Sequence, residues 1–135
     1  MIGVKIKDKK RSNGGGSTLT FSLKDILAVI GEKVLTSRWR CSELDYLKKT
    51  DEEFYSKKVR TMKLSGAELI DFSEKVGLIL DGRFEAKSEG GAKRPWLLIV
   101  AFDTSWYEVW SSKPWVIEKM KAHFKDVSEI NAKIN

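Results

Sequence analysis

The sequence predicts an α+β fold: a mainly antiparallel sheet with about three helices packed against it. Three observations lead to this prediction. Serine-led capping boxes open amphipathic segments near residues 22 and 65, three strand-like segments follow one another over residues 78–111, and apolar and polar side chains alternate elsewhere. Strands and helices do not alternate strictly, so a doubly wound parallel sheet is not expected.

The N-terminal segment alternates apolar residues with lysines over residues 2–9, a pattern typical of a strand with one solvated face. The glycine run that follows is either a flexible linker or the loop of a hairpin. We therefore expect residues 1–17 to form a basic strand and glycine-rich loop. Residues 18–127 are then a single α+β domain, and residues 128–135 a C-terminal tail.

Helices are expected over residues 22–31, over residues 65–77 and from about Pro114 onward. The second of them is the best defined, because Ser65 and Glu68 have the spacing of a capping box and a glycine stands at its end. Pro114 suits the first turn of a helix, where its missing N–H costs nothing.

Strands are expected over residues 33–43 and 59–64, where the two-residue period returns. The segment between them, residues 44–56, sustains no stripe of either period, so the sequence predicts a loop with a helical turn. Residues 78–111 are expected to form a three-strand meander, because their connections are short. Its middle segment, residues 96–102, is apolar at every position, which predicts a central strand covered on both faces.

The chain of 135 residues carries a net charge of +6, and the N-terminus holds most of it. Residues 1–11 contain five cations and one aspartate, a surplus of four, so the remainder of the chain carries only +2. No apolar run approaches the roughly 20 residues that cross a bilayer. Charges occupy the place of a signal peptide's apolar core, and a lone Cys41 can form no internal disulfide, so we expect a cytoplasmic protein without membrane contact.

The residues that support common catalytic sites are scarce. One cysteine and one histidine are too few for a structural zinc site, and we expect no cofactor and no enzymatic activity. Cys41 shares a predicted strand face with Trp39, so a buried, unreactive thiol is expected. The carboxylates Asp81 and Glu85 with Lys87 resemble a nuclease triplet in type, but alternating charge on one strand is typical of a solvated face.

The remaining feature of the sequence is its combination of cationic and aromatic side chains. Nucleic acids bind such surfaces, because cations contact phosphates and unpaired bases stack on aromatic rings. Trp106 and Trp110 share a strand face with Glu108 and are expected to be partly exposed, whereas Trp39 and Trp96 are expected in the core. The N-terminal lysines have a second explanation, the protection of a sheet edge against aggregation. The candidate binding residues are Lys5, Lys7, Lys9, Lys10, Arg11, Arg38, Arg40, Trp106 and Trp110.

The stretch KKVRTMKLSGAELIDF, residues 57–72, is similar in pattern to the basic strand that enters a capped helix in Whirly-type single-strand-binding transcription cofactors. The resemblance implies an interaction with single-stranded nucleic acid. It contains no diagnostic residue, and the helix expected at residues 22–31 departs from that family's order of elements.

Two functional hypotheses follow from these patterns. The first is a non-enzymatic module that binds single-stranded nucleic acid through the basic and aromatic residues. The alternative is a protein-binding module, such as an inhibitor, immunity or adaptor protein, whose exposed aromatics form a hot spot. A third and weaker hypothesis is a nuclease or hydrolase that uses the strand at residues 81–87.

Overall fold

The computed structural model describes residues 1–11, 14–49, 54–88 and 93–130. Its strands are β1 (Ile2–Ile6), β2 (Lys9–Arg11), β3 (Ser17–Leu19), β4 (Ser37–Lys49), β5 (Phe54–Ser65), β6 (Val76–Ser88), β7 (Leu97–Phe102), β8 (Trp106–Ser111) and β9 (Val127–Ile130). Its helices are α1 (Leu23–Ile30), α2 (Gly66–Lys75) and α3 (Pro114–His123), with a short 3₁₀ turn at Glu32–Val34. The α+β class predicted from the sequence is confirmed.

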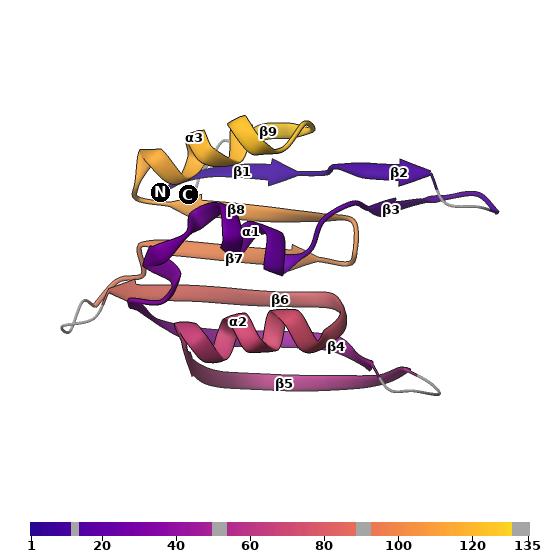
Figure 1. Cartoon of the computed structure of the whole chain (residues 1–135), viewed down its shortest axis with the longest axis horizontal. Coiled ribbons are helices and arrows are strands. Elements are labelled where there is room, and N and C mark those ends of the chain that lie inside the picture. The colour runs from indigo at the N-terminus through magenta and orange to yellow at the C-terminus, as the bar shows by residue number, and fades with distance from the viewer. Residues whose placement is uncertain (12–13, 50–53, 89–92, 131–135) are drawn as a thin grey trace.

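Seven strands form one antiparallel sheet in the order β5-β4-β6-β7-β8-β1-β9 (Figure 1). The three consecutive strands predicted over residues 78–111 are β6, β7 and β8, each paired with the next. They are the centre of the large sheet rather than a separate meander.

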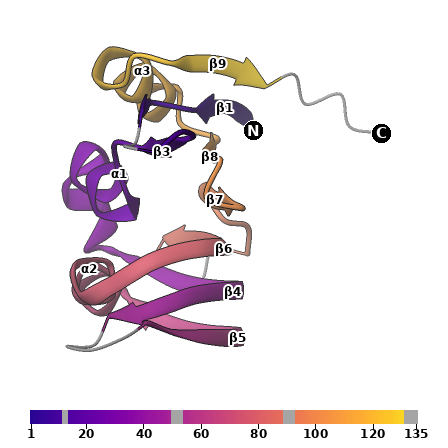
Figure 2. The same cartoon turned by 90° about the vertical axis from the view of Figure 1, so that its right-hand side faces the viewer.

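The three helices pack on one face of the sheet (Figure 2). Alternate strand residues point toward them and are fully buried, among them Val4, Phe84 and Ile99. Leu69 of α2 and Met120 of α3 are also fully buried and belong to the same core. None of the helices in the described part of the chain has the length and apolar character that crossing a membrane requires.

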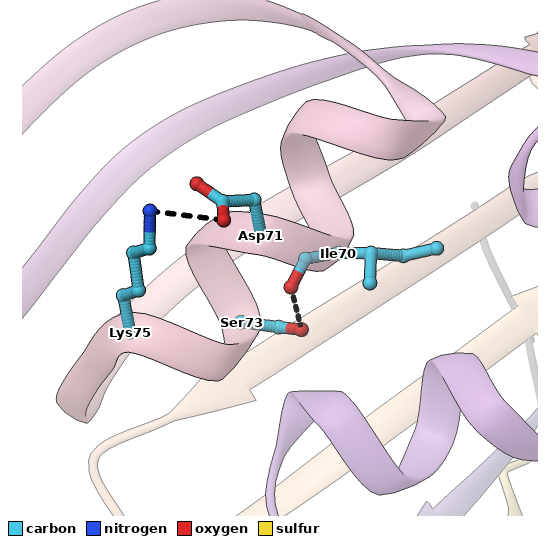
Figure 3. Close-up of polar contacts among 4 residues, drawn as sticks. All are labelled: Ile70, Asp71, Ser73 and Lys75. Carbon is cyan, nitrogen blue, oxygen red and sulfur yellow. Dashed lines mark hydrogen bonds and ion pairs between the residues drawn. The ribbon is translucent and has the colours of Figure 1, made fainter.

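The caps of the helices explain where they begin. The Ser65 hydroxyl accepts the Glu68 N–H at 3.1 Å, and the Glu68 carboxylate accepts the Ser65 N–H at 2.9 Å, so the predicted capping box is present. Figure 3 shows two further contacts of α2: Lys75 pairs with Asp71 at 3.0 Å, and the Ser73 hydroxyl donates to the Ile70 carbonyl at 2.7 Å. Residue 76 already starts β6, so α2 ends slightly before the glycine expected to stop it.

The expectation of a loop over residues 44–56 was wrong. β4 continues to Lys49 and β5 starts at Phe54, so most of this segment belongs to a long hairpin. The alternation of buried and exposed side chains along β4 is interrupted at Glu43, which has a φ of 50°. The register between β4 and β6 shifts just beyond this residue. Leu44 is nevertheless buried, at 1% exposure.

The two ends of the chain meet in the sheet. β1 pairs with β8 on one side and with β9 on the other, so Lys5, the lysine of β1, does not protect an exposed edge. β9 forms where the sequence predicted a tail. The predicted alternative of a glycine-looped hairpin is confirmed, because β2 pairs with β3 and extends beyond the main sheet (Figure 1). Gly14, Gly15 and Gly16 all have positive φ in its loop, a conformation that glycine adopts without strain.

We predict that Ser65→Ala lowers the free energy of unfolding by about 1 kcal/mol, because an N–H at the start of α2 loses its acceptor. Urea denaturation measures the change. Ser65→Asp is the matched control and should retain most of the stability, because aspartate also caps helices well. Equal stability of the alanine variant and the parent would show that this cap contributes nothing.

Candidate functional site

The face of the sheet opposite the helices is termed the open face, because no helix of the described residues packs on it (Figure 2). Residues paired across neighbouring strands lie on the same face, so the register identifies its side chains. One such row crosses the whole sheet, and its members are Lys63, Arg40, Glu85, Leu98, Trp110, Gly3 and Ile130.

The centre of the open face is apolar. We term it the aromatic strip and define it as Leu98, Val100, Phe102, Trp106 and Trp110. β7 was expected to be covered on both faces, but only its helix-facing residues are buried, and Phe102 is 47% exposed. An exposed apolar surface of this kind is typical of an interaction site.

Trp106 is enclosed by its neighbours. Phe102 stacks on it with ring centroids 4.4 Å apart and an interplanar angle of 13°. The Lys5 ammonium lies 4.2 Å from the Trp106 ring centroid, and that of Lys7 lies 5.8 Å away. Because Phe102 and Lys5 come from the strands on opposite sides of β8, they contact opposite faces of the ring.

Glu108 connects the two tryptophans of β8. One oxygen of its carboxylate accepts the Trp106 indole N–H and the other accepts the Trp110 indole N–H, both at 3.0 Å. Trp110 lies directly over Gly3. A Cβ on Gly3 would be 2.8 Å from Cε2 of the indole and closer still to Cδ2 and Cε3. The absence of a side chain on Gly3 therefore allows the ring to lie against β1.

The other half of the open face is basic. Arg38, Arg40, Lys63 and Lys87 line a shallow depression over β4, β5 and β6. Two carboxylates also line it, Glu85 from β6 and Glu68 from the first turn of α2. Arg83, also on this face, lies 4.0 Å from the Glu85 carboxylate. With β6 two strands from β8, and strands about 4.8 Å apart, the basic surface starts about 10 Å from the tryptophans.

The nine candidate residues fall into three groups. Trp106 and Trp110 lie together with Lys5 and Lys7, whereas Arg38 and Arg40 lie on the same face three strands away. The remaining three, Lys9, Lys10 and Arg11, are exposed on the β2–β3 hairpin. The structure therefore gathers four of the residues, places two more on the same face and separates three.

Several open-face residues were not among the candidates. Phe102 was assigned to a covered strand, and Gly3 had no recognisable signal, because its role depends on a partner more than 100 residues away. Lys63 and Lys87 could have been found from their strands: each is paired with an arginine of β4, Lys63 with Arg40 and Lys87 with Arg38.

The structure also tests the predictions made for the two core tryptophans and for the carboxylates considered as a nuclease site. Trp39 and Trp96 are in the core as predicted, with indole N–H groups donating to the Val34 carbonyl and the Ser37 hydroxyl. The carboxylates considered for a nuclease do not converge: Asp81 accepts the Asp103 N–H, and Glu85 faces Arg83. Among the described residues no group of three His, Cys, Asp or Glu side chains could hold a metal ion.

Comparison with protein families, curated proteins and solved structures finds no match for this chain.

We predict that Cys41 does not react with Ellman's reagent at pH 8 in the native protein and reacts fully after denaturation. The side chain is fully buried, and desolvation raises the pKa of its thiol from 9.0 to about 12. Since the folded-state pKa is the higher one, the contribution of this thiol to stability is complete below pH 9 and is lost toward pH 12. Rapid native labelling would contradict the buried position.

Proposed function

We propose that the protein binds single-stranded nucleic acid on the open face of its sheet, as a binding module rather than an enzyme. One observation carries the proposal: the aromatic strip and the basic surface lie on the same uncovered side of one sheet. Rings that stack on bases and cations that contact phosphates are the two components such a site combines.

The charge of the open face favours a polyanion. Its regular ladder carries the cations Lys5, Arg38, Arg40, Lys63, Arg83 and Lys87. Within this ladder Glu85 and Glu108 are the described carboxylates, a surplus of four, and the Glu108 carboxylate already accepts two indole N–H groups. Past the register shift between β4 and β6, the acidic residues Asp45 and Asp81 are paired with each other across the strands, and Asp45 is also opposite Lys58. Cations left without carboxylate partners are available to phosphates.

The rings favour a single strand over a duplex. In a double helix the base faces are stacked on each other, so only unpaired bases can stack on a protein side chain. Each base stacked on an aromatic ring contributes about 1–3 kcal/mol. A cytoplasmic location, in which lone Cys41 stays reduced, is part of the proposal.

A protein partner is the alternative, and the aliphatic part of the aromatic strip favours it. Leu98 and Val100 are half-buried and cannot form stacks with bases, but they would pack well against an apolar side chain of a partner. Such binding would depend weakly on salt, in contrast to binding of a polyanion.

We predict that a fluorescein-labelled dT20 oligonucleotide binds with a log–log salt slope of about −3, as expected if about four phosphates are neutralised on a single strand. Fluorescence anisotropy at several salt concentrations measures the slope. A duplex of the same length should bind at least about tenfold more weakly, since its bases cannot stack on the protein.

The variant Arg38→Gln/Arg40→Gln should reduce the magnitude of the slope by about 1.4, because two phosphate contacts are lost. The matched control is Lys24→Gln/Lys119→Gln, which removes the same charge from exposed positions of α1 and α3. If both variants change binding equally, the effect is one of net charge and the open face is not the site. If the parent does not bind at low salt, the proposal is wrong.

A further inference from the structure

We infer that Trp110 is the nucleobase-stacking surface on β8, and that Gly3 and Glu108 are the positioning residues that hold its ring in place. This inference rests on the proposed function and identifies which ring receives a base. Its components come from segments far apart in the sequence, because Gly3 on β1 is the cross-strand partner of Trp110.

Trp106 is not available to a base, although the sequence offers it equally. Phe102 occupies one face of its ring and Lys5 occupies the other, at centroid distances of 4.4 Å and 4.2 Å. A base could reach this ring only by displacing one of the two contacts. Trp106 therefore supports Phe102 and orients Lys5, whose ammonium stays on the open face.

Trp110 has the opposite arrangement. One face of its indole covers the Gly3 backbone, so the other face is turned away from the sheet, and no ring or ammonium group of the described residues stacks on it. The indole N–H is held by Glu108, which fixes the rotation of the ring. Trp110 is also paired with Leu98, in the row that leads to Glu85 and Arg40. This row ends in Arg40 and Lys63, so a strand stacked on Trp110 has cations for its phosphates on the same face.

Gly3 is the residue on which this geometry depends most. An alanine there would place its methyl carbon within the fused rings of Trp110, so the indole would have to leave the sheet surface. Gly3 has no positive φ, and the strand backbone accepts alanine without strain. The substitution is therefore directed at the ring and not at the fold.

The test compares two ligands with the same number of phosphates, a thymidine decamer and an abasic decamer, in fluorescence anisotropy. The parent should bind the thymidine decamer at least about tenfold more tightly, because only this ligand can stack. Trp110→Ala and Gly3→Ala should abolish this preference, because neither variant presents an indole held in place for a base to stack on. Trp115→Ala, which removes a half-buried indole from α3, should leave the preference intact.

The indole N–H resonances of the free protein give a second readout that needs no ligand. Glu108→Gln should shift the signals of Trp106 and Trp110, while those of Trp39 and Trp96 stay in place, because their acceptors are Val34 and Ser37. Gly3→Ala should shift the Trp110 signal and likewise leave those of Trp39 and Trp96 unmoved.

The outcomes separate the two proposals. Equal affinity of the parent for both decamers overturns the stacking surface and leaves phosphate binding on the open face standing. Binding of neither decamer overturns both proposals. Retained preference in Gly3→Ala, or unmoved indole signals in Glu108→Gln, removes that residue from its positioning role.

Discussion

Burial of only one face of the seven-stranded sheet is the constraint on which the rest of the molecule depends. Side chains alternate along each strand, so the residues packed beneath the helices fix the identity of those on the other side. Val109 is fully buried in the core, and its neighbours Glu108 and Trp110 must therefore point outward. The open face is therefore a direct consequence of the core. A shift of strand register by one residue would turn the core side chains of that strand toward solvent.

The position of β1 in the sheet brings its residues to the candidate site. Inserted between β8 and β9, it extends the covered face with Val4 and Ile6 and brings Gly3 and Lys5 beside the tryptophans of β8. Asp8 secures the same region, since its carboxylate accepts the backbone N–H groups of Lys125 and Asp126. The aromatic strip itself belongs to β7 and β8, and β1 supplies the residues that lie against its tryptophans.

Local signals made much of the fold predictable. The cap at Ser65 and the short connections between β6, β7 and β8 depend on residues close in sequence, and both predictions are confirmed. The long β4–β5 hairpin was missed because the bulge at Glu43 breaks the alternation that identifies a strand. The β9 strand was missed because its only described strand partner, β1, lies at the other end of the chain.

The candidate site was predictable only in its parts. Composition and alternation identified Trp106, Trp110, Arg38 and Arg40 as surface residues of the right chemistry. They could not show that no described helix covers the open side of β7, because the sequence of an apolar strand is the same whether or not a second layer is present. Nor could they separate Trp106 from Trp110, since the difference lies in contacts with Phe102, Lys5 and Gly3 on neighbouring strands.

The central claim is that the uncovered face of the sheet is the binding face. Titration of the ¹⁵N-labelled protein with an unlabelled thymidine decamer, followed by backbone amide shifts, tests it most directly. Perturbations should be concentrated in β8, β1, β7 and the β4–β6 region and should be small in α1, α2 and α3. Perturbations concentrated in the helices, with the strands of the open face unmoved, would contradict it.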